Sequence, residues 1–410
     1  MRKLKLSLVT TMAISSICIA NANTLQEALT NGKVSGEVAV TYEGRYFDKD
    51  YGDYYRDSGY GVGSFALGYE TGVWNNLSVK SKFRAYGTIW EDSSSKATGT
   101  GKGDATGRFY EKRGGGDGFA YNGGTKSVDI EELYVKYTPL NNISVIAGRQ
   151  VLKTDWMSKT HDAVKIDATF GSTDIEAIWS LRDGRVYARD YRPLEKMNGN
   201  KGVYKLGLTQ NFNDNISATA YGVIFPDSKE IYGARVNLSY EETSARLHYA
   251  WSDEGKSLDS ANVKDVKSGI LDLMISTSIY GLSPYIGYVK VNDDLAFPGY
   301  TTNNKSREAG EILVPFEEGD YIFSRGASTI YAGITKTFGD FDATLLYGNT
   351  RYYADATGNE KRDVDETTLW LGYKITSELK TNLGFTYVNE DKKSPISDYS
   401  QLNLTMVYSF

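Results

Sequence analysis

The last ten residues of the chain alternate between apolar and mainly polar side chains and end on an aromatic residue. Successive side chains of a β-strand point to opposite faces of a sheet, so this period of two predicts a strand with one apolar face. The apolar positions are Leu402, Leu404, Met406, Tyr408 and Phe410.

The same period recurs along the chain, and charged side chains in the middle of a strand keep almost always to one parity. Lys80, Lys82 and Arg84, for example, all face away from Leu77 and Phe83. A strand of this kind has one face for an apolar environment and one for water. Further alternating segments are 232–240, 245–251, 330–334, 341–347, 369–375 and 383–387.

Short and long connections take turns between these segments. Long loops at one end and short turns at the other are typical of an outer-membrane barrel rather than a soluble sandwich. The short connections are 71–76, 138–142, 171–172, 211–215, 241–244, 281–283, 339–340 and 377–378. The long connections are 47–59, 91–127, 152–162, 182–201, 253–267, 292–326, 355–366 and 389–399.

These patterns predict an all-β protein, a transmembrane antiparallel up-and-down β-barrel of about 18 strands in the bacterial outer membrane. Closing the sheet leaves no edge strand for lipid to contact. Tyrosines near strand ends, such as Tyr69 and Tyr240, suit the headgroup level of a bilayer. A barrel of this width is too wide for side chains alone to fill, so we expect a water-filled interior narrowed by an inward loop.

Composition agrees with a β-rich chain. Aromatic residues make up 13% of it, and Tyr (32) outnumbers Phe (15) and Trp (6) together. A helical membrane protein would need runs of about 20 apolar residues, which the alternating segments do not supply.

The first residues have the features of a secretory signal peptide, over residues 1–22. A basic start at Arg2, Lys3 and Lys5 precedes a mostly apolar stretch, and Ala20-Asn21-Ala22 fits the small-x-small rule for cleavage after Ala22. The remaining residues 23–410 are then expected to form a single barrel.

Removal of that segment takes away Cys18, the one cysteine of the chain, and changes the formal charge from −6 to −9, with 43 basic against 52 acidic residues. The sequence therefore predicts no disulfide, no cysteine metal site, no cofactor and no nucleic-acid partner.

Short stretches of the chain resemble a known family. Asn23 to Thr30, followed by Gly32 to Val38, is similar to the mature start of epsilonproteobacterial major outer-membrane porins, and Ala147 to Gln150 with the terminal Phe410 resembles the porin D family. The resemblance implies an 18-stranded diffusion channel that is usually a homotrimer. It also implies that the third external loop, here Leu152 to Asp162, folds into the lumen.

Charged side chains on the polar parity are the candidate lining of the lumen. A Lys or Arg facing lipid at the bilayer midplane costs about 2–4 kcal/mol, so these residues must face water. Opposite charges across a constriction would orient polar solutes; pairing for stability is the alternative for any single residue. The candidates on the strands are Lys80, Lys82, Arg84, Glu132, Lys165, Arg235 and Arg246.

At the proposed constriction we expect Arg149, Lys153 and Asp155 to line the narrowest point. Arg149 shares its parity with Val145 and Ala147, so a position at the outer rim is the alternative. The loop could equally be a surface loop without a gating role.

The connection 91–127 is rich in glycine, but no helix follows it, so we expect a flexible external loop rather than a phosphate-binding one. Acidic residues in the external loops could attract Ca²⁺, although their spacing matches no compact calcium loop, and a solvated acidic surface is the simpler interpretation. They are Asp253, Glu254, Asp293, Asp294, Glu317, Glu318 and Asp320.

The sequence thus predicts a porin, not an enzyme, for passive diffusion of ions and small hydrophilic solutes, with a weak cation preference and with outer-membrane lipid and lipopolysaccharide around it. An adhesin or structural barrel would also suit long loops. A barrel hydrolase would have to use His161 or His248, and His161 has no serine nearby in sequence except Ser158.

Overall fold

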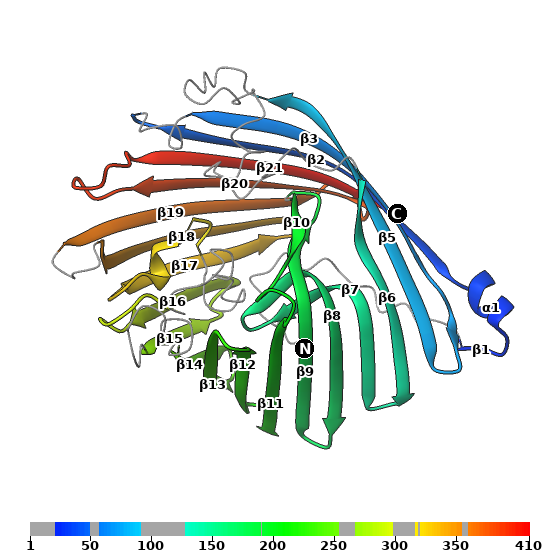
Figure 1. Ribbon diagram of the computed structural model, residues 1–410. Helices are drawn as coiled ribbons and strands as arrows, with labels where there is room; N and C mark the ends of the chain where they lie inside the picture. The colour runs from blue at the N-terminus through cyan, green and yellow to red at the C-terminus, as the bar shows by residue number, and fades with distance from the viewer. Residues whose placement is uncertain are drawn as a thin grey trace.

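The computed structural model describes residues 21–49, 57–91, 128–189, 191–253, 267–297, 316–318, 320–354 and 360–410 (Figure 1). Residues 1–20 of the predicted signal peptide and residues 92–127 of the predicted Gly-rich loop lie outside them.

Antiparallel strands form a closed barrel (Figure 1). Of the 21 strands in the described ranges, β1 (Asn21–Ala22), β4 (Val73–Trp74) and β10 (Tyr191–Lys196) are short additions, and the other eighteen make the wall. The predicted barrel of about 18 strands is therefore confirmed. The wall strands are β2 (Lys33–Phe47), β3 (Ser58–Glu70), β5 (Leu77–Glu91), β6 (Val128–Leu140), β7 (Ile143–Thr154), β8 (Met157–Phe170), β9 (Thr173–Val186), β11 (Val203–Asn213), β12 (Ile216–Phe225), β13 (Lys229–Tyr240), β14 (Thr243–Asp253), β15 (Lys267–Thr277), β16 (Leu282–Val291), β17 (Ser328–Phe338), β18 (Phe341–Tyr353), β19 (Lys361–Lys374), β20 (Leu379–Asn389) and β21 (Tyr399–Ser409).

The C-terminal strand closes the barrel by pairing with β2. Beyond the ladder of β2 and β21, the backbone of Gly36 donates to Phe410 O at 2.8 Å, and Phe410 N donates to Gly36 O at 3.0 Å. The Phe410 ring lies over Gly36, where a Cβ atom would be 2.0 Å from the ring. The terminal aromatic residue thus covers a backbone with no side chain at the joint between the first and last wall strands.

Alternation along the strands separates an apolar outside from a polar inside. On β2, the side chains of Val38 and Val40 are exposed, whereas Glu37, Thr41 and Glu43 are buried. The same reversal of the soluble pattern holds around the barrel, because the exposed large residues of the wall are mostly aliphatic or aromatic. Such a surface suits lipid outside and polar groups within.

The eight short connections predicted from the sequence all join neighbouring strands. They lie between β3 and β5, β6 and β7, β8 and β9, β11 and β12, β13 and β14, β15 and β16, β17 and β18, and β19 and β20. At the opposite end, the connection between β12 and β13 was not predicted as a separate one. It is only residues 226–228, and Phe225 O accepts from Ser228 N at 2.9 Å.

The N-terminal part of the described chain lies at the end with the short turns. The helix α1 (Leu25–Thr30) begins at Thr24, whose side chain accepts from Glu27 N, and Ala28 O accepts from Gly72 N in the first short connection. Within the described ranges, no helix has both the length and the apolar character needed to cross a bilayer.

Glycines within the strands make room for aromatic rings from the neighbouring strand. The rings of Tyr331, Tyr285 and Trp370 lie over Gly287, Gly333 and Gly384, where a Cβ atom would be 2.0–2.3 Å from the ring. A flat ring over a cross-strand glycine restores the packing that the glycine itself cannot supply. The high Gly and Tyr contents of the chain therefore serve the same sheet.

Gly287→Ala is expected to destabilise the barrel by about 1–3 kcal/mol, because the new methyl group would overlap the Tyr331 ring. The free energy of unfolding, measured with urea in detergent micelles, tests this. Gly87→Ala is the matched control, since a Cβ atom at Gly87 on β5 meets nothing within 4 Å. Equal stability of the two variants would contradict the prediction.

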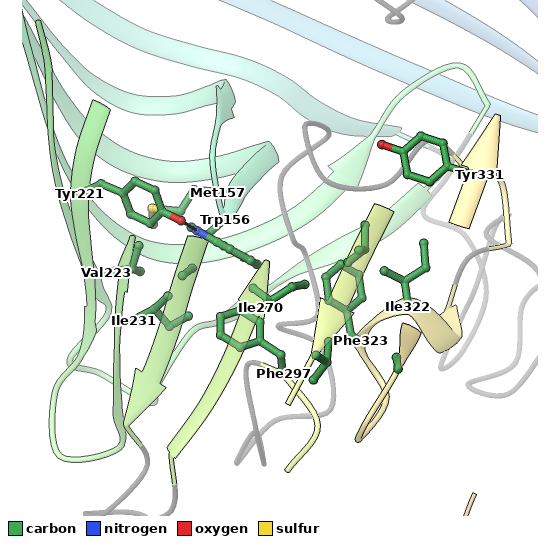
Figure 2. Packing of buried hydrophobic residues seen from close by; sticks show 14 of the residues in the cluster. Trp156, Met157, Tyr221, Val223, Ile231, Ile270, Phe297, Ile322, Phe323 and Tyr331 are labelled. Atoms are coloured by element: carbon green, nitrogen blue, oxygen red, sulfur yellow. Dashed lines mark hydrogen bonds between the residues drawn. The ribbon is translucent and has the colours of Figure 1, made fainter. Parts of the chain in front are cut away.

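An apolar cluster lies inside the barrel (Figure 2). The tip of the β7–β8 hairpin contributes Leu152, Trp156 and Met157, and Phe297 packs against Trp156 with ring centroids 5.2 Å apart. The 3-10 helix η2 (Asp320–Phe323) adds Ile322 and Phe323. Segments that follow strands β7 and β16 in the chain thus fill part of the interior.

Candidate channel lumen and constriction

The predicted basic row on β5 faces the interior, and each of its members has an acidic partner. Lys80 Nζ lies 2.8 Å from Glu132, and Lys82 Nζ lies 2.7 Å from Glu131. The row is therefore one half of a set of ion pairs rather than a free positive surface.

Arg84 is the most deeply placed member of that row, with 1% of its side chain exposed. Its guanidinium donates to Glu131 at 2.9 Å, to Glu37 at 2.7 Å and to Ser64 Oγ at 3.0 Å. A charge removed from water in this way is stable only while its partners remain.

Glu131 was not predicted from the sequence to face the interior, because a β-bulge changes the face to which it points. Lys82 is opposite Glu132, but the next residue, Phe83, is opposite Ile130, so Glu131 is an extra residue in β6. A bulge breaks the alternation of faces. Both neighbouring carboxylates consequently reach the same basic row, which a strict period of two does not allow.

A second group of ion pairs lies on β8, β9 and β11. Lys165 Nζ is 2.7 Å from Asp167 and 3.4 Å from Glu176, and Lys205 Nζ is 2.7 Å from Glu176. Lys205, which the sequence analysis did not select, alternates with the exposed Tyr204 and Leu206 and could have been found on that parity.

Residues 152–162 are mostly strand and not a loop. Only Asp155 and Trp156 connect β7 and β8, and Trp156 turns the chain with φ +64°. The side chain of Lys153 is exposed, in contrast to its buried neighbour Leu152.

The tip of this hairpin nevertheless reaches strands that are not its neighbours in the wall. Asp155 accepts two hydrogen bonds of 2.7 Å from Arg235 on β13. Trp156 Nε1 donates to Tyr221 OH on β12 at 2.5 Å, and this hydroxyl lies 2.6 Å from His248 Nε2 on β14. Because β9 and β11 separate the hairpin from these strands, the tip crosses the interior (Figure 2).

Two other predicted residues are placed apart from this tip contact. Arg246 on β14 lies 2.7 Å from Asp272 on β15, a carboxylate with no exposed side-chain area. Arg149 donates to Asp162 at 2.8 Å and to Asp129 at 3.2 Å, and Asp129 is opposite the inward-facing Arg84. Of the predicted residues, the structure brings Asp155 and Arg235 together, but not Arg149 and Lys153 with them.

A second crossing segment, between β9 and β10, was assigned from the sequence to the external loops. Thr41 Oγ1 on β2 donates to Ala188 O at 3.2 Å, and Tyr86 OH on β5 donates to Tyr187 O at 3.1 Å. Tyr191 OH also donates to Asp129 on β6. The contact of Ala188, just after β9, with β2 crosses the barrel, because five wall strands lie between β9 and β2 on that side.

The segment after β16 meets this crossing segment from the other side. Arg189 forms an ion pair with Glu317, and its guanidinium carbon lies 5.5 Å from the centre of the Trp370 ring on β19. Glu317 also accepts from Asn403 Nδ2 at 3.1 Å. We call these four residues, with Arg45 and Glu318, the constriction.

Arg45 and Glu318 complete the constriction at the β2–β21 joint. Arg45 donates to Glu318 at 2.6 Å and to Gln401 Oε1 at 2.6 and 2.9 Å. Glu317 and Glu318 were assigned to an acidic loop surface from the sequence; each is instead paired with an arginine. Nothing in the local sequence signals this, since the partners are far apart along the chain.

The segment before β17 is also tied to the loop after β20. Tyr321 OH in η2 donates to Glu390 at 3.0 Å, and burial raises the pKa of this carboxyl above its usual value. Glu390 is thus a buried carboxyl that contacts the Tyr321 hydroxyl and not open water.

Two features that the sequence left open, metal ligands and the histidines, can be described for the part of the chain that the structure covers. No group of three or more His, Cys, Asp or Glu side chains there could hold a metal ion. His161 is 1% exposed, and its ring nitrogens contact Ser180 Oγ at 2.9 Å and Ser158 O at 2.7 Å. Both nitrogens are therefore engaged within the protein.

The N-terminal part of the chain matches a known protein family. Residues 1–178 match the sequence profile of the Campylobacter major outer membrane protein family. A search of curated proteins finds no match.

Solved structures of other bacterial proteins share the fold at low sequence identity. OccAB4 of Acinetobacter baumannii has a TM-score of 0.71 and 12% identity over 92% of this chain and 98% of that one. OccAB2 of the same species has a TM-score of 0.71 and 15% identity over 94% and 99%. OccK3 (OpdO) of Pseudomonas aeruginosa has a TM-score of 0.69 and 14% identity over 94% and 97%. The expected resemblance to these porins is confirmed.

Proposed function

We propose that this protein is a porin of the bacterial outer membrane, a water-filled channel through which ions and small hydrophilic solutes diffuse passively. The single observation that carries the proposal is the reversed polarity of the barrel. Apolar side chains such as Val38 and Phe83 are exposed outside, and ion pairs such as Arg84 with Glu37 lie within. Lipid outside and water inside stabilise this arrangement, and water outside does not.

The crossing segments give the channel its selectivity. The β7–β8 hairpin tip and the segment 187–189 both enter the interior, and the second of them meets Glu317. Solutes larger than the space beside these segments are held back, and charged solutes meet fixed arginine and carboxylate groups there.

Reconstitution in a planar lipid bilayer tests the function. Protein purified in detergent is expected to produce stepwise increases in current, and liposomes that contain it are expected to swell in small sugars. A protein that inserts into the bilayer without any conductance step would overturn the proposal, and surface-ligand binding without conductance would favour the adhesin alternative.

We also propose a weak preference for cations, on the basis of the formal charge of −9 for residues 23–410, with 43 basic against 52 acidic residues. An excess of fixed negative charge raises the local concentration of cations. The reversal potential in a KCl gradient is therefore expected to have the sign of K⁺ selectivity, and the opposite sign would contradict this.

The same proposal includes a homotrimer embedded in outer-membrane lipid and lipopolysaccharide, on the basis of the resemblance to porins. Exposed aromatic residues such as Tyr249 and Trp251, with ring centroids 6.4 Å apart, suit the interface between acyl chains and headgroups. The mass of the protein in detergent, from light scattering, tests the assembly.

A further inference from the structure

We propose that Glu366 is a positioning residue of the channel, whose buried carboxylate holds Glu317 and Glu318 inside the barrel and so forms the constriction. This inference rests on the proposed porin function and assigns a structural role to one buried side chain of the channel. Glu366 is on β19 and is 6% exposed.

Glu366 is bonded as an anchor for backbone. Its Oε1 accepts from Glu317 N at 2.8 Å, from Glu318 N at 3.3 Å and from Thr368 Oγ1 at 3.0 Å. Two successive backbone N–H groups directed at one anion form a compact binding arrangement. A buried carboxylate requires such donors, so the contact fixes both the carboxylate and the peptide segment.

The contact with Glu366 lets the side chains of Glu317 and Glu318 reach two different sets of partners. With its backbone held, Glu317 reaches Arg189 and Asn403, and Glu318 reaches Arg45 at 2.6 Å and Tyr399 OH at 3.4 Å. The single carboxylate of Glu366 therefore supports contacts to β2, to β21 and to the crossing segment after β9.

Glu366 acts through these residues rather than by direct contact with solute. It is nearly fully buried, whereas the Arg189 side chain is 32% exposed and lies beside the Trp370 ring. Arg189, rather than Glu366, is therefore the side chain that a passing solute can contact. Loss of the anchor would weaken the ion pairs of Glu317 with Arg189 and of Glu318 with Arg45.

The hydrophobic neighbour Phe316 limits the effect to a local change. Its ring lies over Gly348 on β18 and has its centroid 5.9 Å from that of Tyr331. This packing keeps the segment near the wall when Glu366 is altered. We therefore expect a reoriented pair of carboxylates and not an unfolded barrel.

The test compares Glu366→Ala and Glu366→Gln with the wild type in planar bilayers under a KCl gradient. The alanine variant is expected to have a higher single-channel conductance and a reversal potential shifted towards anions, because the carboxylates of Glu317 and Glu318 are no longer held beside Arg189 and Arg45. In the glutamine variant, the amide oxygen still accepts from the two backbone N–H groups, so conductance is expected to be restored. Glu317→Ala is expected to shift the reversal potential in the same direction as Glu366→Ala.

The outcomes separate this inference from the function on which it rests. A wild type without conductance overturns the porin proposal itself. A conducting wild type with an alanine variant of equal conductance and reversal potential overturns only the role of Glu366. A glutamine variant that matches the alanine variant in both quantities also overturns it, because the charge and not the anchoring would then matter. If the alanine variant does not fold, Glu366→Asp replaces it: the shorter side chain cannot reach both N–H groups and is expected to shift both quantities, and wild-type values would contradict the inference.

Discussion

Trp156→Ala is expected to increase the single-channel conductance, because the tip of the β7–β8 hairpin would no longer be held in the interior. The substitution removes the ring that packs against Phe297 at 5.2 Å and the hydrogen bond of 2.5 Å to Tyr221 OH. Removal of a buried tryptophan costs about 3–5 kcal/mol, which is several times the thermal energy. The inward position of the tip should then be only partly populated, and the current should fluctuate between levels.

Arg235 supplies an independent way to release the same tip. Arg235→Ala removes the two hydrogen bonds of 2.7 Å to Asp155 but leaves the Trp156 packing in place. A smaller increase in conductance is expected. Lys153→Ala is the matched control, since this residue on the same hairpin has an exposed side chain. Wild-type conductance in Trp156→Ala would show that the tip does not limit the current.

Arg84→Ala is expected to cause the largest loss of stability among the ion-paired residues of the lumen. Glu37 and Glu131 would both lose their guanidinium partner, at 2.7 and 2.9 Å, while they remain almost fully buried. Breaking a buried pair on one side costs about 3–5 kcal/mol. The free energy of unfolding in urea and detergent measures the effect, and the loss of one positive charge should also move the reversal potential further towards cations.

Lys80→Ala on the same strand provides the comparison for Arg84. The Lys80 side chain is 25% exposed and contacts Glu132 at 2.8 Å. A partly exposed pair contributes roughly 1 kcal/mol or less. If the two alanine variants have equal unfolding free energies, the burial of Arg84 does not carry the stability that its contacts suggest.

The charged residues selected from the sequence are neutralised in pairs that the sequence did not identify. Lys80, Lys82 and Arg84 were found on the inner parity, but their neutralisation depends on Glu131 and Glu37. Glu131 faces the row because of a bulge, and Glu37 lies 47 residues before Arg84 in the chain. A reading of single strands finds the inner face, and only the pairing of strands reveals whether its charge is free.

The residues of the constriction were still harder to predict from the sequence, because their partners are far away along the chain. The sequence analysis assigned residues 182–201 and the acidic Glu317 and Glu318 to external loops, because they are polar segments between strands. The ion pair between Arg189 and Glu317 joins residues 128 positions apart. Solvation of a polar loop and pairing inside a barrel require the same residue types, so composition does not distinguish them.

The sequence by itself determined the barrel, its approximate number of strands, the two faces of each strand and the sidedness of the connections. These follow from local physics: a strand has a period of two, lipid excludes charge, and turns need few residues. Tertiary structure alone decided which segments cross the interior, which carboxylate meets each arginine, and that Trp156 and Glu366 hold those segments. Such contacts arise where strands far apart in the chain face each other across a closed sheet, and no local pattern records that geometry.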